Sequence, residues 1–190
     1  MDHLSVLRNH FSNIPFNHKM AADRGISKNV IHSMLKAGFI ARIYRGIYAM
    51  IDTELDQEFY FRCATLKAGT ESYISTVSAY IYYELSDHVG RKVWISVHAN
   101  CRRNEKWLRT IRVRNLYPEI GISKKLGYRI SNIERTIVDG FRYQKLVGLR
   151  QAADAYKNAI LKKQTTPAGV YEMAGLLQVE KSVKPFIEIL

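Results

Sequence analysis

The first positions of the chain carry apolar stripes at helical spacing, interrupted by polar caps and glycines. Apolar residues recur every three to four positions over 4–11, which predicts a first helix. Asn17 and Ser27 are residue types that begin helices, and they predict the starts of a second and a third helix. Gly25 and Gly38 follow these segments and are suited to end them in a left-handed conformation.

A β-hairpin is predicted directly after the third helix. The segment 39–50 is rich in Ile, Tyr and Phe, which favour strands, and the pair Arg45-Gly46 interrupts it at a position suited to a turn. Three helices followed by a hairpin is the layout of a winged helix-turn-helix. The sequence therefore predicts such a domain over residues 1–52.

The rest of the chain mixes helical and strand patterns. Helices are expected to begin at or near Thr53, Val77, Ile133, Leu149 and Thr166, and strands are expected over 92–98, 110–116 and 128–130. The sequence Ser131-Asn132-Ile133-Glu134 is a capping-box pattern, with Ser131 as the expected cap and Glu134 reaching back to it. The expected fold class is α+β, with the winged helix followed by a mixed α/β domain over 53–190.

Charge changes sign where this boundary is expected. The chain of 190 residues has 29 Lys+Arg against 17 Asp+Glu, a net charge of +12. Residues 1–50 hold seven basic and two acidic side chains, 51–90 hold two basic and seven acidic, and 91–130 hold eleven basic and two acidic. Two basic blocks separated by an acidic one favour two surfaces that meet a polyanion, most often nucleic acid.

Composition narrows the class of protein. Apolar residues make up 47% and charged residues 24%, as in ordinary globular proteins. No stretch approaches the roughly 20 apolar residues of a membrane span, and the first residues do not resemble a signal peptide. Two cysteines, Cys63 and Cys101, are too few for a disulfide framework. We expect a soluble cytoplasmic protein without a membrane partner.

The outward positions of the predicted third helix carry the chemistry of base recognition. They are polar and none is acidic: Lys28, Asn29, His32, Ser33 and Lys36. Lys can reach guanine O6/N7 or phosphate, and Asn can pair with adenine N6/N7. The N-terminal end of such a helix points into the major groove, so Lys28 and Asn29 are the best candidates for reading bases.

The predicted hairpin would be the wing, with Arg42, Tyr44 and Arg45 at or next to its turn. Arginines at this place can hold backbone phosphates or enter a narrow minor groove. Two alternatives stand beside the DNA interpretation. Any solvated amphipathic helix shows lysines outside, and winged helices also serve as surfaces that dock proteins.

Four segments carry a combined pattern that is typical of one family. These are Gly25-Ile-Ser-Lys-Asn-Val-Ile-His-Ser-Met-Leu-Lys-Ala-Gly38, Ile40-Ala-Arg-Ile-Tyr-Arg-Gly-Ile-Tyr-Ala49, Ile74-Ser-Thr-Val-Ser-Ala-Tyr-Ile-Tyr-Tyr-Glu-Leu85 and Ile133-Glu-Arg-Thr-Ile-Val-Asp139. Together they resemble the AbiEi antitoxins, transcriptional regulators of abortive-infection (type IV) toxin–antitoxin operons. The resemblance covers roughly residues 15–140. The last fifty residues match no pattern of the family, and the chain is short for it.

The resemblance implies two activities. The N-terminal domain would bind an inverted repeat of double-stranded DNA in its own promoter, with two copies per operator, and repress transcription. The C-terminal domain would support neutralisation of a partner toxin, a nucleotidyltransferase-like protein encoded beside it.

A second basic block lies between residues 91 and 114. It contains Arg102, Arg103, Lys106, Arg109, Arg112 and Arg114, interleaved with Trp94, Trp107 and the nearby Tyr117. Basic and aromatic residues together can indicate phosphate contacts with base stacking. This leaves an alternative function, an RNA- or protein-binding module centred on the block. A solvated strand face with the tryptophans in the core is the plainer interpretation.

Signatures of enzymes and cofactors are missing from the sequence. It has no Walker-type loop, no GxGxxG and no GxSxG, and no Gly-Ser dipeptide of the kind that marks a nucleotidyltransferase. His98 and Cys101 have the spacing of half a zinc site, without a second pair. We therefore expect no catalytic activity, no metal and no cofactor.

Overall fold

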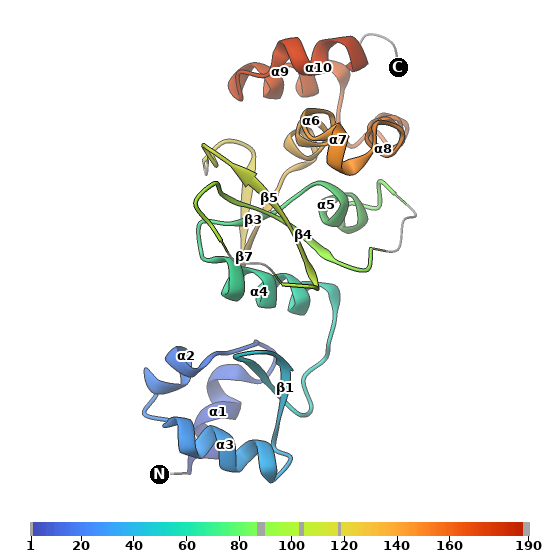
Figure 1. Cartoon of the computed structure of the whole chain (residues 1–190). Coiled ribbons are helices and arrows are strands. Elements are labelled where there is room, and N and C mark those ends of the chain that lie inside the picture. The colour runs from blue at the N-terminus through green and yellow to red at the C-terminus, as the bar shows by residue number, and fades with distance from the viewer. Residues whose placement is uncertain (1, 87–89, 103–104, 118, 188–190) are drawn as a thin grey trace. The chain divides into compact units, whose positions relative to one another are not determined.

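The chain divides into an N-terminal unit, Met1–Lys67, and a C-terminal unit, Ala68–Leu190 (Figure 1). The structure is a computed structural model that describes residues 2–86, 90–102, 105–117 and 119–187. Both units combine helices with β-structure, so the fold is α+β. The boundary expected after residue 52 lies inside the first unit, which continues into helix α4 (Gln57–Ala68).

Three helices and a two-stranded antiparallel hairpin open the N-terminal unit. They are α1 (His3–Phe11), α2 (His18–Ala22), α3 (Lys28–Lys36), β1 (Ile40–Tyr44) and β2 (Ile47–Met50). Side-chain oxygens begin each helix: Asp2 Oδ1 accepts from the Leu4 N–H at 3.1 Å, Asn17 Oδ1 from Met20 at 3.0 Å, and Ser27 Oγ from Val30 at 3.4 Å. The starts predicted at Asn17 and Ser27 are confirmed.

Apolar side chains from all five elements meet in one core. Fully buried members include Leu7 of α1, Ile31 of α3 and Met50 of β2. The segment before α2 joins the hairpin, because Phe16 and Tyr48 exchange two backbone hydrogen bonds of 2.9 Å each. This pairing fixes the start of α2 against β2, so the helices and the hairpin are held in one arrangement.

Helix α4 begins later than the sequence predicts. Thr53, the expected cap, donates its hydroxyl to the Ser12 carbonyl at 2.9 Å and so secures the end of α1. Asp56 begins the helix instead, with Oδ1 accepting from the Phe59 N–H at 2.6 Å. The prediction of Thr53 as the cap is wrong because the hydroxyl has a tertiary partner.

The C-terminal unit is built on a five-stranded mixed sheet. Its strands are β3 (Tyr73–Ile74), β4 (Val93–His98), β5 (Leu108–Val113), β6 (Ile122–Lys125) and β7 (Tyr128–Ser131), in the order β5-β4-β3-β7-β6. Strands β4 and β5 are parallel over six register pairs, from Val93–Leu108 to His98–Val113. Strand β5 therefore forms one edge of the sheet.

Helices α5 to α10 gather on one side of this sheet (Figure 1). They are α5 (Thr76–Tyr82), α6 (Ile133–Arg142), α7 (Gln144–Val147), α8 (Leu149–Leu161), α9 (Pro167–Leu176) and α10 (Glu180–Ile187). Helix α6 contacts α5, α8, α9 and α10 and is buried along most of its length. Within the described parts of the chain, no helix is long and apolar enough to cross a membrane.

Arg135 of α6 is buried, 1% exposed, and organises the centre of this unit. Its Nη1 donates to the carbonyls of Tyr117 (2.7 Å) and Ile120, and its Nη2 donates to the carbonyl of Leu116 at 2.5 Å. Its Nε lies 3.6 Å from the carboxylate of Asp139, one turn along the helix. One guanidinium thus holds the chain between β5 and β6 against α6.

The capping box predicted at residues 131–134 is wrong. Asn132, not Ser131, begins α6, with its Oδ1 accepting from the Arg135 N–H at 2.9 Å. Ser131 belongs to β7, and its hydroxyl lies 2.7 Å from the Thr136 hydroxyl in a buried contact. Glu134 does not reach back to the cap, because its carboxylate accepts a hydrogen bond from Thr165 at 2.8 Å.

Candidate nucleic-acid interface

Helix α3 presents a continuous polar arc on the side opposite its buried residue, Ile31. All five predicted recognition residues lie on this arc and are exposed: Lys28, Asn29, His32, Ser33 and Lys36. At 3.6 residues per turn, Asn29 and Lys36 lie at the middle of the arc, and Lys28 and Ser33 lie nearer its borders. No acidic side chain belongs to the helix, so the exposed face is positive and rich in hydrogen-bond donors.

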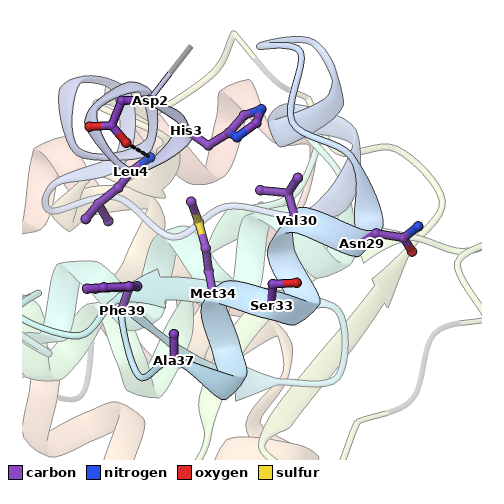
Figure 2. Close-up of a pocket in the computed structure, with 9 residues that line it drawn as sticks. All are labelled: Asp2, His3, Leu4, Asn29, Val30, Ser33, Met34, Ala37 and Phe39. Atoms are coloured by element: carbon purple, nitrogen blue, oxygen red, sulfur yellow. Dashed lines mark hydrogen bonds between the residues drawn. The ribbon is translucent and has the colours of Figure 1, made fainter.

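A hollow of about 620 Å³ borders one flank of α3 (Figure 2). It lies between α3 and the start of α1, and its walls are largely apolar. Val30 and Met34 face the hollow, whereas the amide of Asn29 points away from it (Figure 2). The base-reading candidate is therefore directed outward and is not engaged in packing.

A second hollow of about 370 Å³ borders the other flank of α3. It is lined by His18, Lys28, Asn29, Ile31, His32, Leu35 and Tyr48. The Tyr48 hydroxyl lies 2.9 Å from His18 Nε2, which holds the imidazole at the edge of the hollow. Burial lowers the pKa of His18 below its ordinary value of 6.5, and the charge of Lys28 lowers it further. Four of the five polar residues of the arc, all except Lys36, line one or both of the hollows, and all five are exposed.

His18 was not among the residues selected from the sequence. Its position depends on the pairing of Phe16 with Tyr48, which brings β2 beside the start of α2. No spacing along the chain signals this contact, since His18 and Tyr48 are thirty residues apart.

The hairpin residues divide into two groups. Arg42 and Arg45 are exposed, as a wing that holds DNA requires. Tyr44 instead is half-buried, with its ring centroid 6.5 Å from that of Tyr60 on α4. Burial raises the pKa of Tyr44 to about 12, and the nearby Cys63 and Tyr60 add to this effect. The two arginines are therefore accessible to a ligand, whereas the ring of Tyr44 packs against α4.

The predicted second basic surface is only partly gathered into one place. Lys106, Arg109 and Arg112 line a common groove beside β5, together with Lys92. Arg102 and Arg114 are exposed but do not line this groove, and β5 ends at Val113, before Arg114. Arg103 lies outside the described residues.

In the described part of the chain, candidate metal ligands and thiols do not come together in a site. Among the residues that the structure describes, no three His, Cys, Asp or Glu side chains are grouped so that they could hold a metal ion. Cys63 is buried in α4, and burial raises the pKa of its thiol to about 12. Its sulfur is therefore protonated and shielded at neutral pH.

Comparison with known proteins supplies a fold relationship. No protein-family profile matches the chain, and no curated protein matches it. Among solved structures, the RV2827C protein from Mycobacterium tuberculosis is similar with a TM-score of 0.62 and 12% sequence identity. The match covers 90% of this chain and 69% of that protein. At this identity the similarity concerns the fold alone, and it extends over both units of the chain.

Proposed function

We propose that the N-terminal unit is a winged helix-turn-helix that binds duplex DNA with α3 in the major groove. The observation that carries this proposal is the outer arc of α3. Its five polar residues are exposed, none of them is acidic, and four of them also line the hollows beside the helix, which the buried Ile31 fixes in the core. A major groove about 12 Å wide admits one such helix.

On this proposal, some side chains of the arc contact bases and others contact backbone phosphates. The outward amide of Asn29 can make a bidentate pair with adenine N6/N7, and Lys36 can reach guanine or phosphate. The hollow beside Lys28, His18 and His32 offers one permanent cation and two imidazoles, which suits a phosphate of the strand that borders the groove. Arg42 and Arg45 would hold a further stretch of backbone from the hairpin.

We further propose a biological role in autoregulation. The segments that resemble AbiEi antitoxins include α3, the hairpin and the start of α6. On this basis two copies of the protein bind an inverted repeat in their own promoter and repress it. The C-terminal unit would counter a nucleotidyltransferase-like toxin encoded nearby, without catalysing a reaction itself.

Duplex-binding measurements with the full chain test the proposal. Fluorescence anisotropy would compare a fragment of the protein's own promoter with a scrambled fragment of the same length and base composition, at 100 and 200 mM salt. A specific regulator binds its site roughly 10³-fold or more tighter than random sequence at physiological salt. Equal affinity for both fragments at every salt concentration would overturn the sequence-specific function.

A reporter assay addresses autoregulation separately from binding. The promoter fused to a reporter gene should be repressed when the full chain is expressed. Repression should be lost when the inverted repeat is scrambled. A promoter that is indifferent to the protein would overturn the regulatory role.

A further inference from the structure

A cationic groove runs along the outer edge of the sheet in the C-terminal unit. Its volume is about 540 Å³, and it is lined by Lys92, Glu105, Lys106, Leu108, Arg109, Thr110 and Arg112. The four basic side chains are all exposed. They come from the residue before β4, the turn before β5, and β5 itself. Among the lining residues that the structure describes, four cations therefore share the groove with one acidic side chain.

Packing fixes the two arginines in place. Arg112 donates its Nε–H to the Cys101 carbonyl at 3.0 Å. The guanidinium of Arg109 lies over the ring of Trp94, with its Cζ 5.6 Å from the ring centroid. Because Arg109 covers this ring, Trp94 is not available as a platform on which a base could stack. The groove therefore presents positive charges held in position, and none of its described lining residues is aromatic.

The distribution of charge favours a polymer over a single anion. Arg109 and Arg112 are three residues apart on β5, about 10 Å along the strand, and this odd spacing directs them to opposite faces, so they meet in one groove only because β5 is the edge of the sheet. Separated charges along an edge can contact successive phosphates of a DNA strand, whereas a single small anion would contact only one or two of them. A protein partner would gain its affinity from apolar anchors. The apolar lining residue here, Leu108, is itself buried.

We propose that this groove binds the phosphodiester backbone of duplex DNA without reading its sequence. It would add affinity and salt dependence to the base recognition assigned to α3. The inference rests on the proposed function only in taking duplex DNA as the polymer. The claim that the C-terminal unit contacts the DNA backbone is tested by a separate measurement.

The test uses the full chain and a duplex of random sequence. Lys92→Gln together with Lys106→Gln removes two exposed charges that have few packing roles in the fold. Each lost phosphate contact lowers the slope of log K against log[salt] by about 0.9, so the pair should lower it by about two. The affinity should fall by the same factor on promoter and scrambled DNA. Arg150→Gln with Lys157→Gln, exposed cations of α8, should leave the slope unchanged.

A second pair of substitutions in the same groove provides an independent test. Arg109→Gln with Arg112→Gln should lower the slope at least as much, with the folded state checked by its unfolding temperature. If both pairs retain the wild-type slope and affinity, the groove does not contact DNA. If both lose affinity for poly-glutamate of matched charge but not for DNA, the occupant is an acidic protein and the proposal is overturned. If the wild type itself shows no preference for the promoter while both pairs of substitutions still lower the slope, the function of α3 is overturned and the groove stands.

Discussion

The hydroxyl of Tyr48 on strand β2 lies 2.9 Å from Nε2 of His18 on helix α2. This contact joins the hairpin to the helix that precedes α3, at the edge of the hollow where we expect a phosphate. The imidazole is partly buried and lies near the charge of Lys28, so its pKa is lowered. The protein should therefore respond to pH through this residue.

The first prediction concerns stability at mildly acidic pH. The unfolded chain takes up a proton on His18 near pH 6.5, whereas the folded imidazole resists it. Unfolding is therefore favoured as pH falls from 7 to 5, and this stability is regained as pH rises. His18→Gln should make the free energy of unfolding, measured with urea, less dependent on pH over this range.

The matched control is His10→Gln, which alters an exposed imidazole on α1. If the loss of stability between pH 7 and pH 5 is as large in His18→Gln as in the wild type, the environment of His18 described above contributes nothing to it.

The second prediction concerns the hairpin. Arg45 is exposed at the turn, so Arg45→Ala should weaken binding to promoter and scrambled DNA by the same factor. It should lower the salt slope by about one, as expected for one phosphate contact. Titrations at several salt concentrations measure both effects. Arg8→Ala on α1 serves as the control, and a loss confined to the promoter would show that Arg45 reads a base.

The third prediction concerns the core of the C-terminal unit. Arg135→Met leaves the carboxylate of Asp139 buried without its cation, and it removes the donors that hold the carbonyls of Leu116, Tyr117 and Ile120. Breaking a buried pair in this way costs about 3–5 kcal/mol of stability. Urea unfolding should show this loss, whereas Arg150→Met on the exposed face of α8 should change stability by less than about 0.5 kcal/mol. A loss below about 1 kcal/mol for Arg135→Met would contradict the organising role of this guanidinium.

Short sequence patterns predict most of the helices and the hairpin of the N-terminal unit. The caps at Asn17 and Ser27 and the helical stripe around Ile31 are properties of short segments, and each specifies its helix directly. The turn at Gly46 has φ of +80°, a conformation that glycine adopts without steric cost. The exposed positions that we propose as recognition residues follow from the same pattern, because a buried stripe defines the opposite face.

The parts that escaped prediction depend on distant partners. Strand β3 is two residues long, and β6 is a polar edge strand, so neither carries a clear alternating pattern. Gly140 lies inside α6 where a helix former would be expected. A Cβ at this position would lie 1.7 Å from the Tyr80 hydroxyl, which only the folded chain reveals. Helix α10 contains Pro185, which hides its helical pattern.

In the candidate site, too, some features follow from the sequence pattern and others depend on contacts between distant residues. The exposure of Lys28, Asn29 and Lys36 follows from helical periodicity alone. The burial of Tyr44 against Tyr60 and the approach of His18 to Tyr48 do not, since both depend on contacts between separate elements. The basic block likewise required the parallel pairing of β4 with β5 before four of its cations could be assigned to one groove.

The most direct test of the account is the affinity of Asn29→Ala for promoter and scrambled duplexes, measured beside Asn9→Ala on the exposed face of α1. If Asn29 reads a base, its substitution costs about 1–3 kcal/mol on the promoter and leaves binding to scrambled DNA unchanged. Asn9→Ala should bind both fragments as the wild type does. An equal loss on both fragments, or no loss on the promoter, would contradict the assignment of α3 as the helix that recognises DNA sequence.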